Sequence, residues 1–139
     1  MENRTTFEDS DDSMMMHKQL VIALSNNIYG AIIRVKEIHL NTSSQTVHEH
    51  ANSIGWRFAQ VYDRLLETIL GITDSKLEFG SIRPNLPEPT NLTQVLKILR
   101  MQVSRTKEQL PGEYCNAIHN ILDEFLVDIN KDIYLSVNR

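Results

Sequence analysis

Cysteine and tryptophan are the scarcest residues in this chain, and each occurs once among 139 residues. Because Cys115 stands alone, no internal disulfide can form. No partnered motif around it indicates a reactive thiol, so we expect a small packed side chain rather than a nucleophile. The length limits the chain to one compact domain.

Long apolar runs are also missing. No segment approaches the ~20 apolar residues needed to cross a bilayer. The acidic start of the chain lacks the basic residues and the apolar stretch of a signal peptide. We therefore expect no membrane partner and a cytoplasmic location, which means the host cytoplasm if the protein is viral.

An excess of one charge is missing from most of the chain. The net charge is −4, and residues 1–13 account for all of it. We expect residues 1–13 to form an acidic disordered tail, followed by a folded domain over residues 14–139. Because a negative tail repels phosphate, DNA binding through the N-terminus is disfavoured.

Strand-type alternation is absent, and apolar residues recur instead at spacings of three and four, which predicts an all-α chain. Four helices are expected: from about Ser13 to His39, from Ser44–Thr46 to Gly71, from Thr90 or Asn91 to just before Pro111, and from near Ile118 almost to the C-terminus. The pattern breaks at about residues 72–90, which contain Gly80 and three prolines. Short, long and short connections predict two antiparallel helical hairpins joined by a long crossover loop, a ferritin-like four-helix bundle.

Four side chains of metal-ligand type stand out in this pattern: His39, His48, Asp63 and Glu67. Imidazole and carboxylate together suit iron, manganese or zinc, and carboxylates stabilise Fe(III). His48 and Asp63 lie on one predicted helix, about 22 Å apart at roughly 1.5 Å per residue. A site that uses all four therefore requires at least two copies of the chain.

A metal site inside the bundle is disfavoured. Asp63 and Glu67 lie one turn apart, but they project away from the apolar stripe of their helix. The chain also contains no Glu-x-x-His pair, the motif of buried di-iron centres. A site between molecules or a solvated helix face remains.

The segments around these residues resemble a known family. They are His39–Thr42, Val47–His50 and Val61–Glu67. They resemble the core of the starvation-type mini-ferritins (Dps) and, more closely, a group of small ferritin-like proteins from bacteriophages and large DNA viruses. The segments 120–126 and 133–135 resemble the closing helix of that viral group.

This resemblance implies a homo-oligomer that binds iron and has ferroxidase activity. It implies that His39 and His48 of one subunit meet Asp63 and Glu67 of a two-fold partner. The sequence departs from the mini-ferritin pattern at two points. The gap from His39 to His48 is about one helical turn shorter than in typical mini-ferritins, and Leu40 replaces the tryptophan that commonly follows the first histidine.

Each candidate ligand also has a plain structural interpretation. His39 is compatible with a helix-end histidine that interacts with terminal carbonyls, and His48 with an exposed residue of a first helical turn. The carboxylates are compatible with a solvated surface, as are Glu124, Asp128 and Asp132 on the last helix. The alternative function is a non-catalytic viral structural or host-interaction protein with a degenerate metal site, in which the acidic tail or the crossover loop meets a partner.

Other residues near the candidate site carry weaker expectations. His50 lies on another helix face from His48 and is expected to be solvated, with a role as the second histidine as the alternative. Trp56 and Tyr62 are expected to pack at the bundle edge or at an oligomer contact, with the quenching of oxidising radicals near an iron site as the alternative. One stripe of the second predicted helix consists mostly of small residues: His48, Asn52, Gly55, Ala59 and Asp63. Such a stripe indicates a second packing surface, with an exposed helix face that packs against nothing as the alternative.

Overall fold

The computed structural model describes the backbone of residues 6–137 and the side chains of residues 12–137. It contains four helices: α1 (Thr6–Asn41), α2 (Gln45–Ile72), α3 (Leu92–Gln109) and α4 (Asn116–Val137). No strand occurs within residues 6–137. The predicted all-α four-helix bundle is therefore confirmed, and none of the helices in this range is long and apolar enough to span a membrane.

Side-chain caps set the starts of α2 and α3. The Ser44 hydroxyl accepts a hydrogen bond from the Val47 amide at 3.2 Å, and the Asn91 side-chain oxygen accepts one from the Gln94 amide at 2.9 Å. Each cap satisfies an amide that has no partner within the helix, which typically stabilises a helix by about 1 kcal/mol. Both starts fall where the sequence predicted them.

The first helix begins earlier than expected. The sequence predicted a start near Ser13 after a disordered tail, whereas α1 is helical from Thr6. An acidic segment is compatible with a helix start, because negative charge is favourable near a helix N-terminus. The part of the predicted tail before Thr6 lies outside the described residues.

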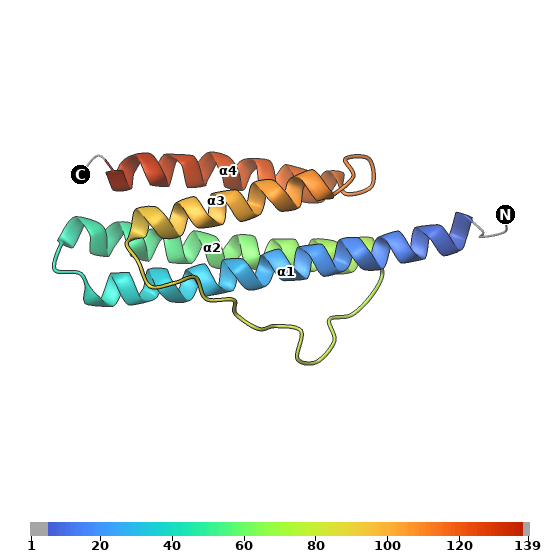
Figure 1. Cartoon of the computed structure of the whole chain (residues 1–139), viewed down its shortest axis with the longest axis horizontal. Coiled ribbons are helices and arrows are strands. Elements are labelled where there is room, and N and C mark those ends of the chain that lie inside the picture. The colour runs from blue at the N-terminus through green and yellow to red at the C-terminus, as the bar shows by residue number, and fades with distance from the viewer. Residues whose placement is uncertain (1–5, 138–139) are drawn as a thin grey trace.

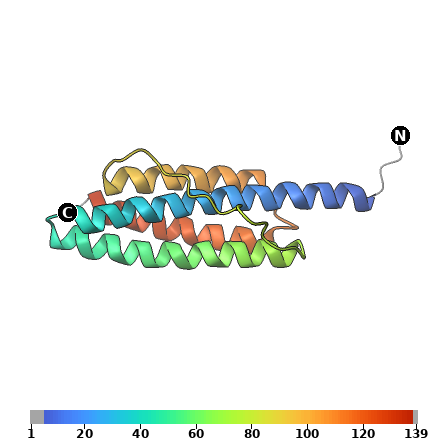
Figure 2. The same cartoon turned by 90° about the horizontal axis from the view of Figure 1, so that it is seen from below.

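The four helices enclose one apolar core. Each helix packs mainly against two neighbours, with α1 against α2 and α3, and α4 against α3 and α2 (Figures 1 and 2). At its centre the Phe58 and Phe125 rings meet edge to face, with centroids 5.2 Å apart. Cys115 is fully buried in this core, and burial raises the pKa of its thiol, as expected of a packed cysteine.

A short turn at residues 42–44 joins α1 to α2 at one end of the bundle, and α3 joins α4 at the opposite end (Figure 1). The segment 73–91 connects α2 to α3 and runs along the outside of α1 for much of the length of the bundle (Figures 1 and 2). We call this segment the crossover.

Hydrogen bonds hold the crossover on α1, and three of them converge on Asn26. Its carbonyl accepts from the Asn85 amide at 3.0 Å, its side-chain amide donates to the Ser81 carbonyl at 3.1 Å, and its side-chain oxygen accepts from the Arg83 amide at 3.0 Å. These bonds satisfy backbone groups of a segment that lacks regular structure. The crossover is therefore a fixed part of the fold.

Gly30 allows the closest approach between α1 and the crossover. A Cβ atom at this position would lie 1.8 Å from the Asn85 carbonyl oxygen, far inside van der Waals contact. Beyond this point the Arg34 guanidinium donates to the Pro87 carbonyl at 2.6 Å. Only glycine permits this packing, because the obstructing atom belongs to the backbone.

Candidate metal site at the α1–α2 turn

The side chains of His39 and His48 bind each other's backbone. His39 is in the last turn of α1, and His48 is in the first turn of α2. The His39 Nδ1 lies 2.9 Å from the His48 carbonyl oxygen, and the His48 Nδ1 lies 2.8 Å from the His39 carbonyl oxygen. The imidazole rings stack, with centroids 3.9 Å apart and planes 26° from parallel. We call this arrangement the histidine pair.

These hydrogen bonds define the tautomer of both rings. A carbonyl oxygen can only accept, so each Nδ1 must carry the proton. When the rings are neutral, the Nε2 atom of each ring then carries a lone pair that can bind a metal ion. Histidines that bind metals have this arrangement, in which one nitrogen donates to a carbonyl or carboxylate and the other binds the ion.

The sequence left open whether His39 and His48 are metal ligands or have plain structural roles, and the histidine pair has features of both. A histidine does interact with a terminal carbonyl of α1, but it is His48 rather than His39. Both residues are half-buried, whereas the plain interpretation of His48 made it an exposed side chain. The carbonyl contacts leave Nε2 of each ring for another partner.

Asp63 and Glu67 do not join the histidines within one chain. Both carboxylates are exposed on α2, farther along the helix than His48. Among the described residues, no group of three or more histidine, cysteine, aspartate or glutamate side chains is placed to hold a metal ion. The structure therefore brings together two of the four predicted ligands and leaves the other two on a separate part of the surface.

An open groove of about 220 Å³ lies beside the histidine pair, between α1 and α2. Its lining residues are Ile32, Val35, Lys36, His39, Ala51, Asn52, Gly55 and Trp56. Trp56 is 69% exposed, so the only indole of the chain lies on the surface at the edge of this groove. A large exposed aromatic side chain next to a groove is typical of a contact surface.

Tyr62, which precedes Asp63, packs at the bundle edge as expected. Its ring contacts Tyr29 of α1 edge to face, with centroids 5.6 Å apart. Burial raises the pKa of the Tyr62 hydroxyl, and the nearby Tyr29 and Asp63 raise it further. This contact fixes the direction of α2 just before the two carboxylates.

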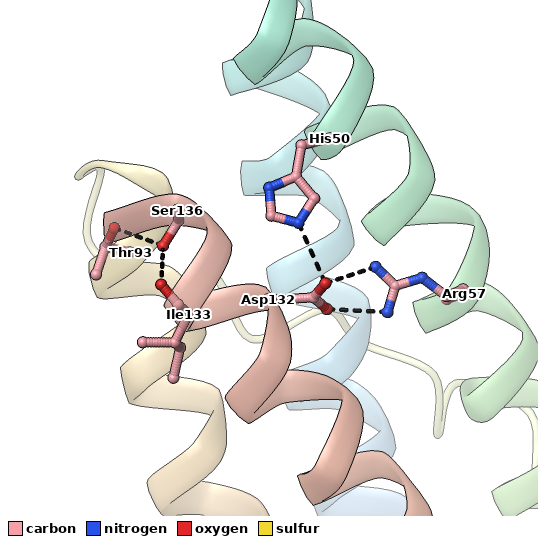
Figure 3. Close-up of polar contacts among 6 residues, drawn as sticks. All are labelled: His50, Arg57, Thr93, Asp132, Ile133 and Ser136. Carbon is pink, nitrogen blue, oxygen red and sulfur yellow. Dashed lines mark hydrogen bonds and ion pairs between the residues drawn. The ribbon is translucent and has the colours of Figure 1, made fainter. Parts of the chain in front are cut away.

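A second polar cluster is buried between α2 and α4, and Figure 3 shows its geometry. Asp132 is 2% exposed, and its two carboxylate oxygens accept hydrogen bonds from the Arg57 guanidinium at 2.8 and 2.9 Å. The His50 Nε2 lies 3.2 Å from one of the same oxygens. We call His50, Arg57 and Asp132 the buried triad.

The buried triad corrects two predictions. His50 was expected to be solvated, but its side chain is 9% exposed and paired with Asp132. Asp132 was grouped with surface carboxylates, yet it is buried. The spacing contained a signal, because Asp132 lies three residues after the core residue Ile129 and therefore on the apolar face of α4. A buried carboxylate requires a partner, and Arg57 supplies a bidentate one.

Near the buried triad, two hydroxyls connect the last turn of α4 to the first turn of α3. The Ser136 hydroxyl donates to the Ile133 carbonyl at 2.8 Å, so the Thr93 hydroxyl must donate to the Ser136 oxygen, also at 2.8 Å (Figure 3). These contacts and the buried triad hold α4 to both of its neighbours at the end of the bundle that carries the α1–α2 turn.

At the other end of the bundle, another histidine is buried, and one of its ring nitrogens finds no partner among the described residues. His17 of α1 is 9% exposed and packs against the Tyr114 ring, with centroids 5.5 Å apart. Within the described part of the chain, its Nδ1 finds no hydrogen-bond partner. Burial lowers the pKa of the His17 imidazole, because the charged form loses its hydration.

Comparison with known proteins adds no family assignment. The chain matches no protein-family model, no curated protein and no solved structure. The class that the fold defines is a four-helix bundle, and its functional interpretation depends on the geometry of the histidine pair.

Proposed function

We propose that this chain is a ferritin-like, Dps-like iron-binding protein whose metal site forms between two copies. His39 and His48 of one copy supply imidazole nitrogens, and Asp63 and Glu67 of the other supply carboxylate oxygens. The observation that carries the proposal is the histidine pair, in which both Nδ1 atoms donate to carbonyls, so that the lone pair of each neutral ring lies on Nε2.

The ferritin-like topology is part of the proposal. It consists of an α1–α2 hairpin and an α3–α4 hairpin, each antiparallel, joined by the crossover. The two short connections at opposite ends of the bundle and the lengthwise course of the crossover support it (Figure 1). Because the described residues of one chain form no group of ligands that could hold a metal ion, iron would bind on the outer surface of α2, between subunits.

The ligand set suits iron oxidation. Imidazole binds Fe(II), and the carboxylates stabilise the Fe(III) product. Each Fe(II) gives up one electron, while hydrogen peroxide accepts two electrons and two protons and forms two water molecules. Two iron ions are therefore oxidised for each peroxide. This stoichiometry would remove peroxide and Fe(II) together.

The test is anaerobic Fe(II) titration by calorimetry, combined with native mass by light scattering. In the double variant Asp63→Asn/Glu67→Gln, we expect iron affinity to fall about 100-fold or more, beyond the 10–100-fold typical of second-shell losses. The native mass should not change. The control is Glu124→Gln/Asp128→Asn, which removes two exposed carboxylates one turn apart on α4 and should leave affinity unaltered.

Unchanged iron affinity in the Asp63→Asn/Glu67→Gln variant would contradict the shared site. It would favour the second candidate function, a non-catalytic viral structural or host-interaction protein. One observation supports that alternative. The fixed crossover exposes three large apolar side chains: Phe79 at 110%, Leu86 at 47% and Ile82 at 42%. Apolar side chains held out on an ordered loop suit protein recognition.

A further inference from the structure

The surface of α2 combines the largest side chain of the chain with the smallest. Trp56 is 69% exposed, and its neighbour Gly55 lies in the same helix, where a Cβ would meet no atom within 4 Å apart from its chain neighbours and the nearby helix backbone. Glycine within a helix costs about 1 kcal/mol relative to alanine. Gly55 differs from Gly71 of the same helix, which has equally open surroundings, because Gly55 also lines a groove that a side chain of another molecule can enter.

A metal site shared between two copies fixes how their α2 helices align, and this alignment brings Gly55 of one copy to Trp56 of the other. This argument rests on the proposed function. If His48 of one copy meets Asp63 of the other, and the reverse, the two α2 helices pack antiparallel about a two-fold axis. The midpoint of His48 and Asp63 falls between Gly55 and Trp56. Trp56 of each copy therefore faces Gly55 of the other.

The remaining pairs of this register are compatible with close packing. Asn52 of one copy faces Ala59 of the other, so small or short side chains oppose each other on both sides of the axis. The antiparallel arrangement also brings the acidic end of each helix, with Asp63 and Glu67, to the N-terminal half of its partner. That arrangement is electrostatically favourable, because the N-terminal end of a helix carries partial positive charge.

The groove beside Gly55 supplies the space for an indole. It is about 220 Å³ in volume and open to the surface, and both Gly55 and Trp56 line it. Its lining includes the buried Val35 and Ala51 and the half-buried Ile32, while Lys36 and Asn52 are exposed. A lining of apolar and polar residues suits an indole, which is an aromatic body with one N–H donor.

We propose that a second copy of this chain docks on α2 about a two-fold axis and inserts its Trp56 into the groove beside Gly55. The contact is isologous, so each dimer contains two inserted indoles. Trp56 is the anchor of the interface, and the metal sites lie on either side of it, at the two His48–Asp63 pairs.

The single tryptophan makes the contact measurable. In the wild-type protein, Trp56 emission should shift to shorter wavelength as concentration rises, in step with a doubling of native mass. In Gly55→Leu, a leucine fills the groove from within, and the dimer dissociation constant should rise about 30-fold or more, the loss typical of a hot-spot residue. Its emission should remain that of an exposed indole.

The matched control is Gly71→Leu. Gly71 lies in the same helix, and a Cβ there also meets nothing within 4 Å. Both variants replace a helical glycine with a good helix former, so neither endangers the fold. We expect Gly71→Leu to dimerise like the wild-type protein.

Three results would overturn the inference: a monomer at every concentration, a dimer whose Trp56 emission stays that of an exposed indole, or a Gly55→Leu variant that dimerises normally. Iron titration separates this failure from that of the proposed function. A dimer with an inserted indole that does not bind iron retains the docking inference and rejects the metal site. A dimer that binds iron through Asp63 and Glu67 while its indole stays exposed retains the metal site and rejects the docking inference.

Discussion

The histidine pair and the buried triad both include a histidine of α2, only two residues apart in sequence, yet they differ in what their side chains leave open. In the triad, the Asp132 carboxylate is enclosed by the core and engaged by Arg57 and His50. In the histidine pair, each ring uses one nitrogen on a carbonyl and keeps the other. The difference shows that a cluster of ligand-type residues is a binding candidate only if its bonding capacity is unfilled.

Removing the carboxylate of the triad should have the largest effect on stability. Asp132→Ala removes the acceptor that His50 and Arg57 share, and the Arg57 side chain, which is 35% exposed, can still reach water. We expect the free energy of unfolding to fall by about 1–3 kcal/mol, the usual range when a buried hydrogen-bonding group loses its acceptor. Urea denaturation followed by circular dichroism measures the loss.

The control for this prediction is Asp128→Ala, one turn away on the exposed face of α4. Surface substitutions of this kind usually change stability by no more than about 0.5 kcal/mol. Equal effects in the two variants would show that the triad contributes no more to stability than a solvated carboxylate.

The histidine pair should respond in metal affinity rather than in stability. In His48→Asn, the side-chain amide can still donate to the His39 carbonyl, but the Nε2 lone pair is lost. We expect iron affinity to fall at least about tenfold, by comparison with losses of supporting groups. The free energy of unfolding should change by about 1 kcal/mol or less, the typical value of one hydrogen bond.

His50→Asn is the counterpart within the triad, two residues along the same helix. Here we expect a loss of stability, because a buried contact to Asp132 disappears, and no direct loss of an iron ligand. Calorimetric titration and urea denaturation of both variants test this division. If His50→Asn weakened iron binding more than His48→Asn, His50 would replace His48 as the ligand.

The smallest effect should come from His17, a histidine that is buried like the triad but not fully bonded. Its pKa is lowered in the folded state, so the unfolded chain binds more protons once the pH falls below about 6.5, the ordinary histidine value. The stability contribution is intact above that pH and is lost as the pH falls toward the lowered folded pKa. Urea midpoints at about pH 7.5 and pH 5.5 measure this loss.

His17→Phe retains a ring against Tyr114 and removes the proton site. We expect this variant to lose less stability on acidification than the wild-type protein. His119→Gln serves as the control, because His119 has a partner in the Leu110 carbonyl at 2.9 Å. An identical acid response in His17→Phe and the wild-type protein would rule out a contribution from His17.

The sequence was most informative about features that depend on neighbouring residues. The apolar spacing located the four helices, and the polar residues at Ser44 and Asn91 coincide with observed caps. The start of α1 was misplaced, because the acidic segment before Ser13 suggested a tail although it is also compatible with a helix start.

Contacts between distant segments were harder to predict. His50 and Asp132 lie 82 residues apart in sequence, and although the spacing of α4 indicates that Asp132 is buried, it does not indicate which residues pair with it. The crossover was correctly placed as a break between helices, but its attachment depends on the backbone carbonyl of Asn26 and on a glycine at position 30, which no local pattern reveals. The reciprocal carbonyl contacts of His39 and His48 likewise depend on the exact turn between α1 and α2.

The attachment of the crossover has a consequence for the order in which the protein forms. Its hydrogen bonds to α1 join residues 53–59 positions apart, and all of these residues precede α3. As the chain is synthesised from its N-terminus, α1, α2 and the crossover can therefore come together before the second half of the bundle exists. We expect the ribosome to release α3 and α4 onto a partly assembled surface whose outer side the crossover already covers.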